Sequence, residues 1–258
     1  MDDSLRAGIA IYNAGAYRAA HGAWEATWLR LEDETDDERF LHGLIQFTAA
    51  VHHVRDDNDA GAVGLARSAR EYLSGLDDDY RGVNLDAVRS YLAHLEAAAG
   101  ENSTAADTGT TADAESDREA DSNTNTDAGA ATATDTNATA HADSNADTAA
   151  TDAGENGHTP PKLRFDGRVV TYGDLEFEAI VVAAETLAEE RDGYDESVVT
   201  DAIEYARAEV ETGTQTQFTA MVFDFVQNET QRGLVFQRLT EHVRRKRRRE
   251  DDVTGLFD

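Results

Sequence analysis

The sequence has 258 residues, of which 52 are Asp or Glu and 23 are Lys or Arg, so its formal net charge is −29, and it contains no cysteine. The missing cysteine excludes disulfides, zinc–thiolate sites and thiol nucleophiles. So acidic a surface repels itself in dilute buffer but stays soluble at molar salt, where the screening length falls to roughly 3 Å. We therefore expect a protein of a salt-loaded cytoplasm, with an acidic protein of an ordinary cell as the alternative.

The sequence shows no segment of the kind that targets or anchors a chain at a membrane. No apolar run approaches the roughly eighteen residues of a membrane helix. The first residues carry neither the basic segment nor the apolar core of an export signal. We expect a cytoplasmic chain with no membrane partner.

Residues 1–99 are expected to form an antiparallel helical bundle. Apolar residues recur at helical spacing in four segments. These segments are marked by stripes that begin at Ile9, Phe40, Ala62 and Leu85. Asn13 to Gly15 is a plausible break within the first segment, and Asn58 or Asp59 can cap the third. Short connections favour antiparallel neighbours.

Residues 100–159 have a different composition, made almost entirely of Ala, Thr, Asp, Asn, Ser and Gly. Such a segment has no large apolar side chains to bury, so it cannot offset the entropy of chain ordering. It is predicted to be a disordered acidic linker between two domains.

Residues 160–258 are predicted to form a mostly helical domain with a small β-hairpin. Asp166-Gly167 lies between two short apolar runs, which is a strong hairpin signal. The predicted helices begin at Asp174, at Asp195 or Ser197, near Phe218 and near Glu229. The whole chain therefore belongs to the mainly α class.

Two polar stripes fall on the first two long helices of the bundle. His21, Glu25 and Trp28 follow at i, i+4 and i+7, so they share one helical face. A second stripe, at i, i+4 and i+11, consists of His42, Gln46 and His53. If the two helices are antiparallel, these stripes can meet inside the bundle.

The order and spacing of these residues resemble a known family. The similar positions are Tyr12, Asn13, Gly15, Tyr17, His21, Trp24, Glu25, Trp28, Phe40, Gly43, Leu44, Ile45, Gln46, His53, Asn58, Gly61 and Ala62. They resemble the domain-of-unknown-function 309 family over residues 13–73 and more weakly to about residue 98. The resemblance implies an all-helical bundle and no catalysed reaction. Its signature positions here are His21, Glu25, Trp28, Gln46, His53 and Asn58. His42 departs from the pattern, which has Gln or another polar residue there, and the acidic composition resembles that of haloarchaeal proteins.

Two interpretations of the polar stripes stay open. A histidine and a carboxylate one turn apart, joined by a histidine from a facing helix, can bind Zn²⁺, Mn²⁺ or Fe²⁺. His21, Glu25 and His53 would then hold a divalent metal in a hydrolase. Alternatively, Glu25 and Gln46 orient the histidines in a hydrogen-bonded network that sets the helix register. The missing fourth ligand favours this second interpretation.

The helical hairpins also suggest an interaction module. The pattern of small residues at helix turns and crossings is similar to that of a tetratricopeptide unit. These small residues are Gly15, Ala20, Gly61 and Ala69. There is no repeat of about thirty-four residues, so a solenoid is not expected. A groove for a partner helix remains possible. We expect an interaction or scaffold protein with an unidentified protein partner, and the metal-dependent hydrolase is the alternative.

The run from Arg244 to Arg249 is the most concentrated positive charge in the chain. Such a run can contact nucleic-acid phosphates, with Arg245 and Arg248 as the exposed candidates. Cations at the end of a helix also offset the helix dipole, and the run can dock on the acidic linker of the same chain or on a partner surface.

Overall fold

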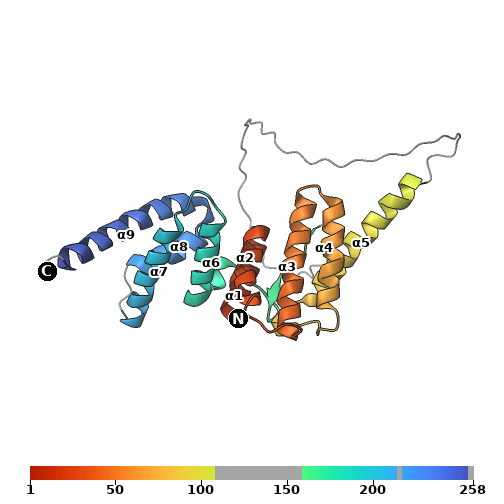
Figure 1. Ribbon diagram of the computed structural model, residues 1–258, viewed down its shortest axis with the longest axis horizontal. Helices are drawn as coiled ribbons and strands as arrows, with labels where there is room; N and C mark the ends of the chain where they lie inside the picture. The colour runs from red at the N-terminus through yellow and green to blue at the C-terminus, as the bar shows by residue number, and fades with distance from the viewer. Residues whose placement is uncertain (108–158, 214–216, 255–258) are drawn as a thin grey trace, which may run out of the picture.

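The computed structural model describes residues 1–107, 159–213 and 217–254, and it is mainly α-helical as predicted (Figure 1). Each of the first helices packs against the one before it, which gives the expected N-terminal bundle. These helices are α1 (Asp2–Asn13), α2 (Tyr17–Trp28), α3 (Asp36–Arg55), α4 (Asp59–Leu73) and α5 (Leu85–Asp107). Helix α5 continues past the expected start of the linker at residue 100. Residues 108–158, which make up most of that predicted linker, lie outside the described part of the chain.

The ends of these helices follow the local sequence signals. Helix α1 stops at Asn13, and Gly15 adopts a left-handed backbone with φ of 85°, which favours glycine. The hydroxyl of Thr35 accepts a hydrogen bond from the Glu38 amide at 3.2 Å and caps α3. The side-chain oxygen of Asn58 accepts one from the Gly61 amide at 3.1 Å and caps α4. The predicted break and the predicted cap of the third segment are confirmed.

Two glycines let neighbouring helices approach closely. A Cβ added at Gly8 would lie 2.0 Å from Nε1 of the buried Trp24 indole, so α1 can meet α2 there only without a side chain. A Cβ at Gly43 would lie 2.5 Å from Cγ of Leu73, which joins α3 to α4 in the same way. The bundle is thus close-packed through glycine as well as through large apolar side chains.

The C-terminal part begins with the predicted hairpin. Strands β1 (Arg164–Phe165) and β2 (Arg168–Val169) pair antiparallel. Asp166 and Gly167 have positive φ values of 49° and 76°, as a type I′ turn requires. The helices that follow are α6 (Phe177–Glu189), α7 (Glu196–Glu211), α8 (Gln217–Gln227) and α9 (Arg232–Thr254).

Two predicted helix starts in this part were wrong. Asp174 is the last residue of the short 3₁₀ turn η2 (Tyr172–Asp174), whose N-cap is Thr171, and its carboxylate accepts hydrogen bonds from the Thr171 amide and hydroxyl at 2.8 and 2.6 Å. Helix α6 therefore begins only at Phe177. Likewise, Glu229 belongs to the 3₁₀ turn η3 (Glu229–Gln231), which precedes α9. In both places a short 3₁₀ turn precedes the α-helix, and at η2 a capping box closes that turn.

The C-terminal part packs against the N-terminal bundle through one continuous hydrophobic cluster, in which α6 contacts α1 and α2 (Figure 1). Two asparagine side chains clamp the hairpin region onto the bundle. Asn13 donates to the carbonyls of Leu163 and Val170 at 2.8 and 2.9 Å and accepts from the Leu163 amide at 2.9 Å. Asn84 accepts from the Arg164 amide at 2.7 Å. The division into domains at residues 99 and 160 stays a prediction, but the described parts on either side of it share a core.

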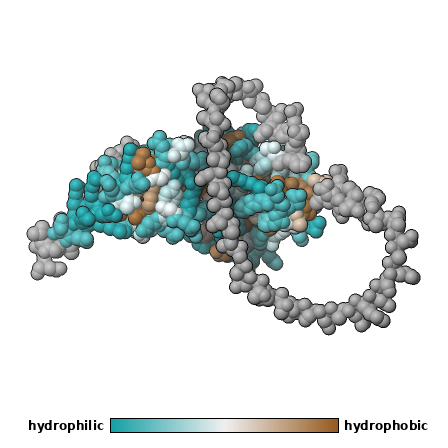
Figure 2. All heavy atoms as spheres, turned by 90° about the horizontal axis from the view of Figure 1, so that it is seen from above, coloured by the Kyte–Doolittle hydropathy of each residue, from teal (hydrophilic) through white to brown (hydrophobic). Residues whose placement is uncertain are grey.

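The surface is largely hydrophilic in the view of Figure 2. A few large apolar side chains are exposed, among them Leu29 on the first bundle and Leu234 on α9. In the described ranges, every helix is too short or too polar to span a bilayer.

Candidate functional site

His21 and Glu25 lie one turn apart on a solvent-facing side of α2. His21 Nε2 is 3.8 Å from Glu25 Oε2, and the two side chains remain 38% and 48% exposed. The opposite side of the helix is buried through Trp24, whose indole donates to the Leu5 carbonyl at 3.3 Å. The two predicted site residues therefore share a face, but that face is open to solvent and not enclosed in the bundle core.

Trp28 belongs to a separate cluster that is centred on Glu38. Its indole Nε1 donates to Glu38 Oε1 at 2.8 Å, and His42 Nδ1 lies 3.3 Å from the same oxygen. The His42 ring stacks on Tyr72 with centroids 3.8 Å apart and lies 4.6 Å from the Trp28 ring. We call Trp28, Glu38, His42 and Tyr72 the Glu38 cluster. It joins α2, α3 and α4 in one polar and aromatic contact.

The geometry of the Glu38 cluster assigns a role to each member. The carboxylate of Glu38 accepts from the indole, and its side chain is only 14% exposed. The imidazole of His42 fills the space between two aromatic rings, and it is 18% exposed. Aromatic pairs at such distances contribute about 0.5–1.5 kcal/mol beyond area burial. The contacts of the cluster therefore hold helices α2, α3 and α4 together.

Sequence reasoning missed two members of this cluster. Thr35-x-x-Glu38 reads as a capping box, in which the glutamate would reach back to the Thr35 amide. The structure instead directs the Glu38 carboxylate to Trp28 and His42. Tyr72 continues the apolar helical spacing that begins at Ala62, so no local signal marks it as a partner of His42. His42, which departs from the family pattern, is engaged more closely than His21.

His53 and Asn58 form a third, separate site at the corner between α3 and α4. The Asn58 amide nitrogen lies 2.7 Å from His53 Nδ1, so the amide donates to the unprotonated ring nitrogen. A Cβ on Gly61 would lie 2.8 Å from both groups, which explains a glycine at this position. Gln46 lies half-buried on α3, between His42 of the Glu38 cluster and His53. Its side chain makes no hydrogen bond to a described residue.

The predicted metal ligands are not gathered into one site. Within the ranges that the structure describes, no three His, Asp or Glu side chains are grouped so that they could hold a metal ion. His21 and Glu25 lie together on α2, whereas His53 is engaged by Asn58 at the end of α3. Binding of a divalent metal by His21, Glu25 and His53 stays a prediction, and this geometry gives it no support.

Asp37 lies in the same first turn of α3 as Glu38 and makes strong polar contacts of its own. Asp37 Oδ1 accepts hydrogen bonds from Arg81 Nε at 2.8 Å and from the Tyr80 hydroxyl at 2.7 Å. The guanidinium of Arg81 lowers the pKa of Asp37 below its usual value. These bonds tie α3 to the 3₁₀ turn η1 (Tyr80–Gly82) ahead of α5.

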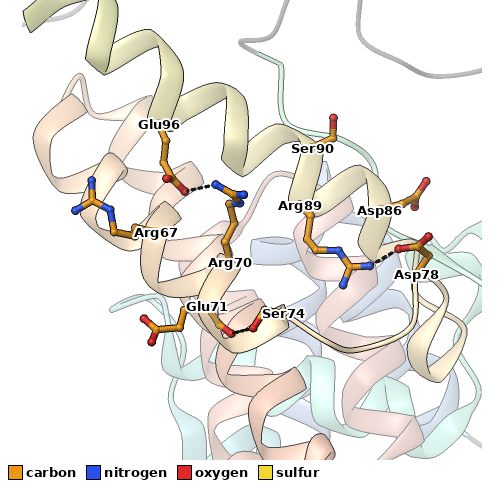
Figure 3. A pocket seen from close by; sticks show the side chains of 9 residues that line it. All are labelled: Arg67, Arg70, Glu71, Ser74, Asp78, Asp86, Arg89, Ser90 and Glu96. Carbon is orange, nitrogen blue, oxygen red and sulfur yellow. Dashed lines mark hydrogen bonds and ion pairs between the residues drawn. The ribbon is translucent and has the colours of Figure 1, made fainter.

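A polar groove of about 660 Å³ lies between α4 and α5 (Figure 3). Its walls carry both signs of charge. The lining residues are Arg67, Arg70, Glu71, Ser74, Asp78, Asp86, Arg89, Ser90 and Glu96. Sequence reasoning singled out none of them, because they lie on the polar faces of two helices and make no compact motif.

Part of the charge in this α4–α5 groove is already paired. Arg70 Nη1 lies 3.0 Å from Glu96 Oε1 across the groove. Arg89 pairs with Asp78 and donates to the carbonyls of Leu73 and Leu76 at 2.9 and 3.1 Å. These bonds fix the groove walls to each other.

Other charged groups of the groove make no ion pair with the described residues. They are Arg67, Glu71 and Asp86. Arg67 and Asp86 lie toward opposite ends of the groove (Figure 3). A segment lying along the groove would therefore meet an unpaired cation at one end and an unpaired carboxylate at the other.

The basic run lies near the C-terminal end of α9, where both predicted contact residues are exposed. Arg245 pairs with Glu241 at 2.9 Å within the same helix. Arg248 makes no ion pair with the described residues. The two candidates thus differ, and Arg248 is the more available cation.

Comparison with known proteins adds a family to the N-terminal part. Residues 5–65 match the family described as Domain of unknown function (DUF309). An uncharacterized protein of Aquifex aeolicus (strain VF5) is 27% identical over 81 residues, which cover 31% of this chain and 24% of that protein. The matched stretch thus spans about a quarter of that relative. No solved structure matches the chain. The range that is similar to DUF309, residues 5–65, contains most of α1, all of α2 and α3, and the start of α4.

Proposed function

We propose that this chain is a protein-interaction module and that the α4–α5 groove binds a segment of a partner protein. The observation that carries the proposal is the set of unpaired charges in a groove of about 660 Å³, which are Arg67 and Glu71 on α4 and Asp86 on α5, with Arg67 and Asp86 toward its two ends. The partner segment presents a carboxylate to Arg67 and a cation to Asp86. Neither the family description nor the name of the relative assigns an activity, so the proposal rests on this geometry.

The paired residues of the groove support a role in recognition. Because Arg70 and Glu96 bridge α4 and α5, the walls stay in place when the groove is empty. A partner therefore meets a preorganised surface and loses less free energy to ordering. Opposite charges at the two ends set the direction in which the segment lies, since reversing it would bring like charges together.

The proposal can be tested by selecting peptides from a displayed library with the full chain. A charge swap, Arg67→Glu with Asp86→Arg, keeps the net charge but reverses the two ends of the groove. The matched control is Arg191→Glu with Asp192→Arg, which makes the same swap at an exposed site after α6. Peptides enriched by the wild-type chain should carry an acidic and a basic residue at fixed spacing, bind the control equally, and lose at least tenfold in affinity for the groove variant.

Equal binding of the selected peptides to the groove variant would place the binding surface elsewhere and overturn the proposal. So would a selection that enriches no peptide above background. Exposed charges are screened by salt, so the affinity of a true groove ligand should fall between low and molar KCl.

A metal-dependent hydrolase is the second candidate, and its motivation is the pair His21 and Glu25, which lie one helical turn apart on α2. Metal analysis of protein purified without chelator decides it. Stoichiometric metal that is lost in His53→Ala without unfolding would support a metal site. Protein without metal, together with a His21→Ala variant that loses only stability, would exclude the hydrolase.

We also propose that the chain functions in a salt-loaded cytoplasm, as its net charge of −29 suggests. Screening at molar salt removes the self-repulsion of the acidic surface. Thermal unfolding in low and in molar KCl tests this. A higher melting temperature in molar KCl is expected, and an unchanged one would contradict the proposal.

A further inference from the structure

The last helix, α9, has an inner face and an outer face with different roles. Its inner face carries Val235, Leu239 and Val243, which are buried in the shared core. The outer face carries exposed arginines. We define the outer face by these residues: Arg238, Arg244, Arg245, Arg248 and Arg249. The helix contacts α7 and α8 and its C-terminal end lies at one extremity of the molecule (Figure 1).

Several side chains near the end of α9 hold it to the body of the protein or to itself. Arg247 pairs with Asp201 on α7, and the Tyr205 hydroxyl donates to Glu250 at 2.8 Å. The Lys246 ammonium lies 5.6 Å from the centroid of the Tyr205 ring. These contacts use the inner cations of the basic run. They fix the orientation of the helix, so the outer face points in a defined direction.

Most arginines of the outer face are not neutralised by the described residues. Arg238, Arg244, Arg248 and Arg249 make no ion pair with them. Arg245 pairs with Glu241, but both side chains are more than half exposed, so this bond is weak and exchangeable. Arg238 and Arg249 are about 16 Å apart along the axis at 1.5 Å per residue. This face is a cationic strip on a chain whose net charge is strongly negative.

We propose that the outer face of α9 binds nucleic acid through the phosphate backbone. Arginine presents a planar fork of donors that matches phosphate geometry, and the strip is built from arginine alone. A duplex offers about one phosphate charge per 1.7 Å of axis, so a strip of this length meets several. At low salt the acidic remainder of the chain repels the same polyanion, which confines contact to this end.

A membrane surface fits this helix less well. An interfacial helix needs a broad apolar face to insert among the lipids. The apolar side chains of α9 at Val235, Leu239 and Val243 are buried within the protein, and Leu234 is the one large apolar residue that α9 exposes in its described part. The outer face therefore offers charge without an insertable surface, which favours phosphates of a nucleic acid.

The expected salt dependence follows from the number of phosphates contacted. With about three contacts, the slope of log affinity against log salt concentration should be about −2.7 for duplex DNA. Raising KCl from about 50 mM to about 200 mM should then weaken binding by about 40-fold. Asp251 and Asp252 follow the strip, so a slope much steeper than this is not expected.

Fluorescence anisotropy of the full chain with labelled nucleic acid tests the proposal. The probes are a duplex DNA of about two helical turns and a single-stranded RNA of equal length. The triple variant Arg244→Gln, Arg248→Gln and Arg249→Gln should lose at least tenfold in affinity and most of the salt slope. A control that removes the same charge from other exposed sites, Arg30→Gln, Arg168→Gln and Arg191→Gln, should bind as the wild type does.

Each alternative outcome overturns the proposal. Wild-type protein that does not raise the anisotropy of either probe in low salt would exclude the site. A triple variant that binds as the control does, with unchanged circular dichroism, would place the contact elsewhere. Polyglutamate that displaces the probes as well as unlabelled RNA at equal charge would identify the ligand as an acidic protein surface.

Discussion

Replacing Glu38 by alanine should destabilise the protein by about 2 kcal/mol. The carboxylate accepts the indole hydrogen bond of Trp28 at 2.8 Å, in a place where the Glu38 side chain is only 14% exposed. Without it the indole N–H loses its acceptor, which costs roughly 1–2 kcal/mol at a partly buried site. Loss of a negative charge in the first turn of α3 adds about 0.3–1 kcal/mol.

Urea unfolding followed by circular dichroism measures this cost, and Asp36→Ala is the matched control. Asp36 also lies in the first turn of α3, but its side chain is 66% exposed, and among the described residues it pairs with Arg39 alone, at 3.5 Å. Asp36→Ala should cost no more than about 1 kcal/mol. For a chain of this size, the Glu38→Ala loss corresponds to a melting temperature lower by roughly 4–8 °C.

A double-mutant cycle with Trp28→Phe isolates the hydrogen bond. Phenylalanine keeps an aromatic ring beside His42 but has no donor, so Glu38→Ala in that background should cost only about 1 kcal/mol. Equal losses in the two backgrounds would show that the indole bond contributes nothing. If Glu38→Ala lowers the free energy of unfolding by no more than Asp36→Ala does, the view that the Glu38 cluster holds the three helices together is refuted.

Three further outcomes are expected from the described contacts. Gly8→Ala should lower the free energy of unfolding by about 2 kcal/mol because its Cβ would overlap the buried Trp24 indole, whereas Gly64→Ala should raise it by about 0.5–1 kcal/mol because the space there is open. Thermal melts that rank the two variants otherwise would contradict this packing. Arg232→Ala should lower the free energy of unfolding in urea by about 3 kcal/mol, because the side chain is 1% exposed and donates to two carbonyls at the end of α8. A loss below about 1 kcal/mol would show that these contacts contribute little to stability. Arg81 lowers the pKa of Asp37 in the folded protein, so the stability that the ionised Asp37 adds is present at neutral pH and lost as pH falls below about 4. The unfolding free energies of the wild type and Asp37→Asn should therefore converge at low pH. A difference between them that does not change with pH would contradict this.

Most of the helices could be predicted because their signals are local. The apolar stripes of α3 and α5 have helical period, and Asn58 and Asp195 are strong caps that the structure confirms. The hairpin at Asp166-Gly167 follows from the backbone that a type I′ turn needs. The starts of α6 and α9 could not be placed so well, because each helix is preceded by a 3₁₀ turn whose residues also suit the start of an α-helix.

The candidate site was less predictable because its residues meet through tertiary contacts. Helical spacing correctly placed His21 and Glu25 on one face, but it cannot tell whether that face is buried. Glu38 and Tyr72 meet Trp28 and His42 only when three helices pack together. Asn13 looks like a helix terminator, yet its side chain also holds the segment around Leu163, 150 positions away.

The sequence by itself determined the helical class, most helix ends, the hairpin and the acidic character of the chain, because each depends on neighbouring residues or on composition. Tertiary structure alone decided that the C-terminal helices share a core with the bundle, that Arg67 and Asp86 flank one groove, and that the outer arginines of α9 stay unpaired within the described residues. The physical reason is that side-chain burial and charge pairing depend on which surfaces meet, and no local pattern records that choice.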